Sequence, residues 1–216
     1  MLKDKDIREG LFNFLEDEYG KIRIFEEKIM GRSRADVVMV TTDSIFGIEI
    51  KSDADTYVRL KRQVKDYNRF YDMNYVVVGT SHAAHIEEHV PDFWGIITVE
   101  EVDNKVDFYI LRRPKTNPML DMTLKLSMMW RPELAHIQEI NEMPKYKERS
   151  KAFVIEKICS KIPYEKLRLQ ISEELFQRDY DSIGEVIKEF RKENGRGVKK
   201  TGKRAVKKAV RRKRKL

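Results

Sequence analysis

The segment Phe46-Gly47-Ile48-Glu49-Ile50-Lys51 decides how the surrounding chain folds. Side chains on a β-strand alternate between its two faces, so one face of this segment is apolar and the other carries Gly47, Glu49 and Lys51. An acid and a base on an otherwise apolar strand are costly to bury without partners. The segment therefore predicts a central strand over residues 45–51 with a polar site on one of its faces.

Patterns on both sides of this strand predict a mixed sheet with helices packed on it. Apolar residues at helical spacing mark the long helices, and β-branched or apolar runs mark the strands. The expected strands cover residues 22–25, 35–40, 45–51, 75–78, 94–99 and 106–111. The expected helices in the same part cover residues 4–19, 55–70 and 83–90. This order of elements implies an α/β fold.

The second part of the chain is predicted to consist of helices followed by a basic tail. Amphipathic helices are expected over residues 118–130, 132–140, 146–161, 164–178 and 181–192. We therefore expect a core over residues 1–113, a helical region over residues 114–192 and a disordered tail over residues 193–216. The helical region is open to roles as a lid, a dimer surface or a nucleic-acid contact. A helix-turn-helix formed by residues 150–176 is a further option, although such pairs are usually packing units.

The positive charge of the chain is concentrated in its tail. The 216 residues carry 44 Lys or Arg and 36 Asp or Glu, a formal net charge of +8. Residues 191–216 hold 14 of the basic residues and one acid, so they carry +13 and residues 1–190 carry −5. A basic segment without aromatic residues suits sequence-independent contact with phosphates, and a solvated extension without a role is the alternative. The candidate nucleic-acid-binding residues are Lys199, Lys200, Lys203, Arg204, Lys207, Lys208, Arg211 and Arg212.

Composition excludes several other classes of protein. A hydrophobic content of 41% supports a packed core. The single cysteine, Cys159, excludes an intramolecular disulfide and a Cys-cluster zinc site, and fits a reducing cytoplasm. The N-terminus lacks the apolar stretch of a signal peptide, and no apolar run approaches the ~18 residues of a membrane span. We therefore expect a cytoplasmic protein with no membrane partner, and a homodimer is possible.

Asp36 supplies a second acid for the polar face of the central strand. It lies at the start of the preceding predicted strand, and a hairpin between the two strands can bring Asp36 close to Glu49. Two carboxylates beside a lysine form a hard-oxygen site that suits Mg²⁺ or Mn²⁺. A metal there would polarise a phosphodiester and activate a water molecule, which Lys51 would orient or deprotonate.

The motif Asp36-(x12)-Glu49-Ile50-Lys51, after an N-terminal helix, resembles that of the PD-(D/E)XK nuclease superfamily. Acid-x-Lys triplets also occur at residues 26–28 and 103–105, but only the triplet at Glu49 lies within an apolar strand that follows a strand-borne Asp. The next helix carries Gln63 and Tyr67, which resemble the QxxxY element of the RecB-like branch and share one helix face. The wider sequence resembles a prokaryotic family of nuclease-like proteins over residues 1–190.

This resemblance implies a restriction-endonuclease-like fold and cleavage of nucleic acid, with DNA expected over RNA. Asp36 and Glu49 would bind the metal together with the backbone carbonyl of Ile50, and Lys51 would be the catalytic lysine. Gln63 and Tyr67 would contact a metal-bound water and the phosphate. A further acid often comes from the first helix or strand, and the candidates are Glu9, Glu16 and Glu27. Such a protein would be nucleoid-associated or encoded by a phage or another mobile element.

Other interpretations stay open. Glu49 and Lys51 can form a simple salt bridge, or the fold can serve as a non-catalytic module that binds nucleic acid or protein. The segment His85-Ile86-Glu87-Glu88-His89 also matches the HxxEH pattern of inverted zinc proteases, with His82 as a third imidazole. That zinc site needs a helix that continues past His89, whereas Pro91 ends it within two residues.

Overall fold

The computed structural model describes residues 4–53, 55–103, 105–178, 189–190 and 192. The strands are β1 (Arg23–Met30), β2 (Ser33–Val40), β3 (Ile45–Lys51), β4 (Met73–Gly79), β5 (Gly95–Val102) and β6 (Lys105–Arg112). The α-helices are α1 (Asp4–Tyr19), α2 (Leu60–Phe70), α3 (Thr80–Ala83), α4 (Met122–Ser127), α5 (Arg131–Ile140), α6 (Lys151–Lys161) and α7 (Tyr164–Gln177). Two 3-10 turns, η1 (Tyr57–Arg59) and η2 (Ile86–Glu88), precede α2 and follow α3.

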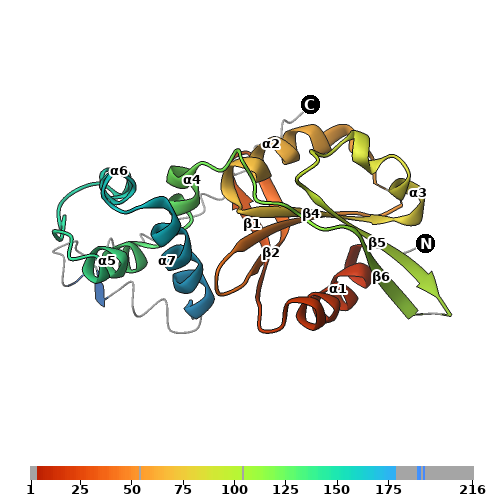
Figure 1. Cartoon of the computed structure of the whole chain (residues 1–216), viewed down its shortest axis with the longest axis horizontal. Coiled ribbons are helices and arrows are strands. Elements are labelled where there is room, and N and C mark those ends of the chain that lie inside the picture. Colours follow the sequence, from red (N-terminus) through yellow and green to blue (C-terminus); the bar gives the residue numbers. More distant parts are fainter. Residues whose placement is uncertain (1–3, 54, 104, 179–188, 191, 193–216) are drawn as a thin grey trace, which may run out of the picture.

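The six strands form one mixed sheet in sequential order from β1 to β6. Neighbouring strands are antiparallel except for β3 with β4 and β4 with β5, which are parallel. Parallel neighbours need a crossover connection, and α2 supplies it between β3 and β4. Figure 1 shows α1 on one face of the sheet and α2 and α3 on the other. The predicted fold class, a mixed sheet flanked by helices and followed by a helical region, is confirmed.

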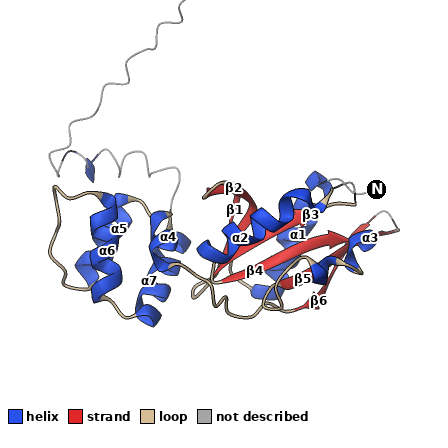
Figure 2. Ribbon diagram, turned by 90° about the horizontal axis from the view of Figure 1, so that it is seen from above, coloured by secondary structure: helices blue, strands red, loops and turns tan. Residues whose placement is uncertain are grey.

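Each face of the sheet has its own apolar core. On one face, α1 buries Ile7, Leu11 and Leu15 against strand residues such as Ile48. On the other face, the core begins at α2 and continues without interruption into helices α4 to α7. The helical region lies beside one end of the sheet in Figure 2. Helices and sheet therefore share one hydrophobic core on the α2 side.

Strand β3 lies in the middle of the sheet and is buried along its whole length. Its apolar residues Phe46, Ile48 and Ile50 pack on the α1 side, as the alternation predicted. On the α2 side, a Cβ added at Gly47 would lie 2.6 Å from Tyr67 Cδ1 and closer still to Tyr71. Gly47 therefore lets α2 pack directly on β3, because no larger residue fits between them.

Several predicted boundaries are wrong. Strand β1 continues beyond the predicted residue 25 to Met30, because it pairs with β2 along its length, so the triplet at residues 26–28 lies within a strand. The helix expected over residues 118–130 is limited to α4, since Asp121 accepts hydrogen bonds from the backbone at its start. Ser150 caps α6 in the same way and shortens the helix predicted over residues 146–161.

Two further expectations differ or cannot be compared. The short helix over residues 83–90 is instead the single turn α3 followed by the separate turn η2. Most of the helix expected over residues 181–192, and the whole tail over residues 193–216, lie outside the described residues. No described helix combines the length and the apolar character that a membrane crossing requires.

Candidate active site

The register of β2 and β3 places Asp36 opposite Glu49. The last Cα pair of this antiparallel ladder is Val37 with Ile48, so the next pair of opposed positions consists of Asp36 and Glu49. Beyond that pair, the backbone N–H of Ile50 donates to Asp36 Oδ2 at 2.9 Å. The side chain of Asp36 thus takes the place of a backbone partner where the ladder ends.

Glu49 is fully buried and is held by three side chains. Lys51 Nζ and Gln63 Nε2 both donate hydrogen bonds to Glu49 Oε1. The hydroxyl of Tyr67 lies 2.8 Å from Glu49 Oε2. Lys51 Nζ also donates to Gln63 Oε1 at 3.3 Å, so β3 and α2 together form a closed network of four side chains.

Tyr67 connects this network to Asp36. Its hydroxyl oxygen accepts a hydrogen bond from the backbone N–H of Asp36 at 3.2 Å and lies 3.1 Å from the carbonyl oxygen of Ile48. The resemblance implied that Gln63 and Tyr67 contact a metal-bound water and the phosphate. In the structure, both side chains contact Glu49, Gln63 also lines the cavity described below, and Tyr67 is fully buried.

Burial controls the protonation of these groups. It raises the pKa of Glu49 to about 7, and the nearby Asp36 carboxylate adds to this rise, whereas Lys51 and Tyr67 oppose it. Burial also raises the pKa of the Tyr67 hydroxyl, with Glu49 as the next cause. Tyr67 therefore stays protonated and can donate to Glu49 at physiological pH.

Arg8 on α1 is a partner of Asp36 that sequence reasoning missed. It donates to the Asp36 carbonyl oxygen at 2.9 Å, and its second guanidinium nitrogen lies 3.8 Å from Asp36 Oδ1. The only signal in the sequence is helical spacing, because Arg8 lies three residues before the buried Leu11. A cation on that face of the helix needs an acidic partner on the sheet.

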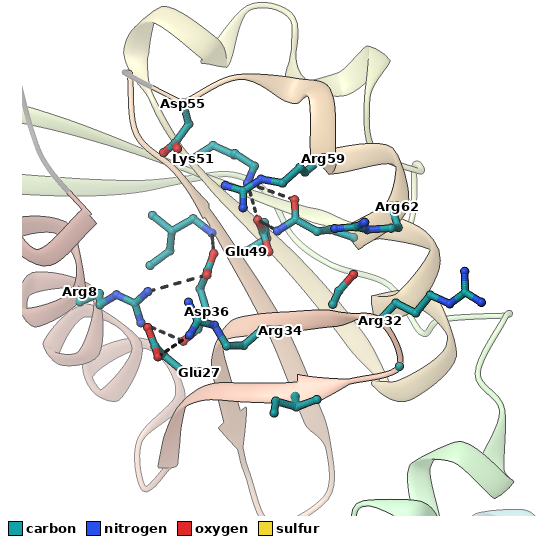
Figure 3. A pocket seen from close by; sticks show the side chains of 15 residues that line it. Arg8, Glu27, Arg32, Arg34, Asp36, Glu49, Lys51, Asp55, Arg59 and Arg62 are labelled. Atoms are coloured by element: carbon teal, nitrogen blue, oxygen red, sulfur yellow. Dashed lines mark hydrogen bonds and ion pairs between the residues drawn. The ribbon is translucent and has the colours of Figure 1, made fainter. Parts of the chain in front are cut away.

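A cavity of about 560 Å³ opens over these groups, as Figure 3 shows. Its lining residues are Arg8, Glu27, Ile29, Gly31, Arg32, Ser33, Arg34, Asp36, Glu49, Ile50, Lys51, Asp55, Arg59, Arg62 and Gln63. Of the three acids proposed as additional ligands, Glu27 lines this cavity, whereas Glu9 and Glu16 do not. Glu27 has a positive φ of 51° and forms an ion pair of 2.9 Å with Arg34.

The histidines do not form the zinc site that their spacing suggested. The backbone of His85 is not helical, so His85 and His89 do not lie on successive turns of one helix. The rings of His82 and His89 pack on Tyr57 instead, with centroid distances of 4.9 and 4.2 Å. In the described part of the chain, no group of three or more His, Cys, Asp or Glu side chains is arranged to hold a metal ion.

The donors at Asp36 and Glu49 still suit Mg²⁺, because this ion usually takes one or two carboxylates and completes its shell with water and substrate phosphates. An ionised carboxylate has about four acceptor positions. Glu49 uses three of them for Lys51, Gln63 and Tyr67, which leaves room for one further ligand at Oε2. The basic residues proposed for nucleic-acid binding, from Lys199 to Arg212, lie outside the described residues.

Comparisons with known proteins give a structural similarity and a family. The curated proteins contain no match to this chain. Among solved structures, Pyrococcus furiosus SfsA in complex with Ca²⁺ is similar at 16% identity and a TM-score of 0.30, over 52% of this chain and 61% of that chain. The family model of bacteriophage P4 protein cII matches residues 1–194. The chain therefore belongs to the family of bacteriophage P4 protein cII.

Proposed function

We propose that the protein is a metal-dependent nuclease that hydrolyses phosphodiester bonds in nucleic acid, with DNA as the expected substrate. The observation that carries this proposal is the opposition of Asp36 and Glu49 at the end of the β2–β3 ladder, beside Lys51 in one cavity. Paired carboxylates next to a lysine are expensive to assemble in a protein interior, and such groups gather at functional sites.

Asp36 and Glu49 would hold Mg²⁺ or Mn²⁺, and the carbonyl of Ile50 would be a third ligand. A strand residue directs its N–H and C=O toward the same side, and the Ile50 N–H already points at Asp36. A bound divalent cation would polarise the scissile phosphate and lower the pKa of a water molecule.

Lys51 would orient the attacking water or hold a proton at its Nζ atom. Its contacts with Glu49 and Gln63 fix that atom at the cavity floor. Gln63 and Tyr67 would act as positioning residues, because both hold the Glu49 side chain from α2. Tyr67 is fully buried and does not line the cavity. The tail over residues 193–216 would add sequence-independent affinity for phosphates outside the cavity.

The test is cleavage by the purified full chain. Labelled single-stranded DNA, duplex DNA and RNA are incubated with Mg²⁺ or Mn²⁺, and EDTA is added to a parallel set. Asp36→Asn and Lys51→Met should abolish metal-dependent cleavage while the circular dichroism spectrum stays native. The control variants Asp92→Asn and Lys61→Met lose a carboxylate and an amine at exposed positions outside the cavity. Both should cleave the substrates at the rate of the unmodified chain. The proposal fails if no substrate is cut with metal, or if the two cavity variants cut as well as the controls.

A non-catalytic binding module is the second candidate. The observation in its favour is that Lys51, Gln63 and Tyr67 already complete a hydrogen-bonded network around Glu49 without a metal. This function predicts salt-sensitive binding of nucleic acid that depends on residues 196–215 and is unchanged by Lys51→Met. A gel-shift assay with the tail removed, run beside the cleavage assay, separates the two functions.

A further inference from the structure

The cavity is positively charged although the body of the protein is not. Residues 1–190 carry a net charge of −5, but the cavity lining has six cationic and four acidic side chains. Five of these cations are arginines, whose planar guanidinium groups suit two-pronged hydrogen bonding to phosphate. An anionic ligand is therefore favoured in this cavity, although the body as a whole carries a net negative charge.

Three of these five arginines form no ion pair with a carboxylate among the described residues. Among the described residues, no carboxylate pairs with Arg32, Arg59 or Arg62, and all three side chains are exposed. Arg34 pairs with Glu27, but the two side chains are 58% and 52% exposed. An ion pair that is open to solvent contributes little to stability, so a phosphate can compete for Arg34.

The four arginines other than Arg8 come from two segments of the chain, here called the two arms. Arg32 and Arg34 come from the β1–β2 hairpin, whereas Arg59 ends η1 directly before α2 and Arg62 lies three residues further on, in the first turn of α2. Figure 3 shows Arg59 and Arg62 reaching toward Glu49 and Lys51 from one side of the cavity.

The two arms are fixed relative to each other. Ser33 Oγ in the hairpin donates to Asp66 Oδ2 of α2 at 2.5 Å. Gly31 allows this close approach, because an added Cβ would lie 3.1 Å from Asp66 Oδ1, and its φ is +55°. The segments that carry the arms are thus held together before a ligand binds, so that binding has to order only the arginine side chains.

We propose that Arg32, Arg34, Arg59 and Arg62 bind the phosphate backbone of a nucleic-acid strand and hold it over Asp36 and Glu49. This inference rests on the proposed function for the identity of the ligand, and it places substrate binding in the cavity in addition to the tail. Two exposed aliphatic residues accompany the arms: Ile29 lines the cavity at 76% exposure, and Val58 precedes Arg59 at 88%. They offer apolar contact to nucleobases, which inorganic phosphate lacks.

Binding is measured in EDTA, so that no strand is cut, with the full chain and a fluorescein-labelled oligonucleotide. The tail is present in every sample, so differences in affinity between variants report binding at the cavity. Arg59→Gln/Arg62→Gln and Arg32→Gln/Arg34→Gln should each raise Kd about tenfold and lower the salt slope by about 1.4, the value for two lost contacts to a single strand. The control Arg69→Gln/Arg113→Gln removes two exposed arginines outside the cavity and should bind as the unmodified chain does.

A crosslinking experiment locates the strand directly. An oligonucleotide with 5-iodouracil is irradiated on the full chain, and the attached peptides are identified by mass spectrometry. Crosslinks to residues 29–34 or 57–63 support the inference, whereas crosslinks confined to the tail overturn it. Unlabelled oligonucleotide should compete for the labelled strand far better than inorganic phosphate at the same phosphate concentration. Equal competition would show a small-anion site and also overturn it.

The failure of this inference is distinguishable from the failure of the proposed function. If the cavity variants bind less well but no strand is ever cut with Mg²⁺ or Mn²⁺, the cavity binds nucleic acid and the nuclease proposal is wrong. If the chain cuts nucleic acid while both arginine pairs bind and crosslink as the control does, the nuclease proposal stands and the arginine inference is wrong.

Discussion

The hydroxyl of Tyr67 on α2 lies 2.8 Å from Glu49 Oε2 on β3, in a place without solvent exposure. This contact joins a helix to the central strand and fixes one of the two candidate metal-binding carboxylates. It exists because Gly47 leaves space for the tyrosine ring on the strand. The same hydroxyl accepts from the backbone of Asp36, so one atom contacts both acidic residues of the site.

Removal of this hydroxyl should therefore reduce metal binding and cleavage strongly and the stability of the fold only moderately. Tyr67→Phe removes the hydrogen bond that the N–H of Asp36 donates to this hydroxyl, and we expect the free energy of unfolding to fall by about 1–3 kcal/mol. Loss of a group that orients a metal ligand should lower metal affinity or cleavage about 10–100-fold. Chemical denaturation and titration with Mn²⁺ measure the two effects.

Tyr71→Phe is the matched control. Tyr71 is also fully buried on α2, but its hydroxyl has no hydrogen-bond partner in the described part of the chain. Its removal should leave stability and cleavage nearly unchanged, since no bond is lost. Equal losses in both variants would show that the Tyr67 hydroxyl has no special role at the site.

The pKa of Glu49, about 7, predicts pH-dependent metal binding. A carboxylate binds a cation only after it loses its proton, so metal affinity should fall about tenfold per pH unit below pH 7. Calorimetry at pH 6 should detect the release of close to one proton per metal bound, and at pH 8 almost none. Proton release that is the same at both pH values would contradict the assignment to Glu49.

The same pKa predicts how stability without metal changes with pH. Because the pKa of Glu49 is higher in the folded protein than its usual 4.5, the folded state holds this proton more tightly than the unfolded state. The stabilising contribution is complete below pH 4.5 and is lost as the pH rises through 7. The difference in unfolding free energy between the native chain and Glu49→Gln, measured from pH 4 to 8, should show this decline.

Local patterns were sufficient to predict the centre of the fold. The alternation in residues 45–51 predicted the strand bounds correctly. It also predicted the faces correctly, because the apolar residues pack in the core on the α1 side. The i, i+4 spacing of Gln63 and Tyr67 placed both on the face of α2 that meets Glu49. These features depend on neighbours along the chain, so the sequence contains their signal.

Features that depend on distant partners were missed. The second half of β1 is polar and is a strand because β2 pairs with it. Arg32 and Arg59 each look like ordinary surface residues, and only the contact of the hairpin with α2 brings them to one cavity. The basic tail holds most of the excess positive charge in the sequence, so the charge pattern along the chain does not reveal this smaller group of cations.

Gly47→Ala should separate α2 from β3. The added Cβ would lie 2.6 Å from Tyr67 Cδ1, and the buried rings of Tyr67 and Tyr71 have no free space to move into. Overpacking of this kind costs about 1–3 kcal/mol, and it should also withdraw the Tyr67 hydroxyl from Glu49 and reduce cleavage. Gly10→Ala on α1 meets only the edge of the partly exposed Phe108 ring and should cost less. The midpoint of thermal unfolding compares the two variants.

The buried pair of Lys125 and Asp72 should be the main polar link between the helical region and the sheet. Lys125 Nζ on α4 lies 2.7 and 2.6 Å from the two carboxylate oxygens of Asp72, which also accepts from the backbone N–H of Ile45. Both side chains are almost completely buried. Lys125→Met leaves the carboxylate without a cation and should lower the free energy of unfolding by about 3–5 kcal/mol.

A double variant tests whether the loss comes from the uncompensated charge. Asp72→Asn/Lys125→Met removes both charges, and the asparagine oxygen can still accept from Ile45, so much of the lost stability should return. Lys61→Met controls for the loss of a lysine at an exposed position of α2. Urea denaturation measures all four proteins. If the double variant is no more stable than Lys125→Met, packing of the lysine stem, rather than its charge, holds α4 against the sheet.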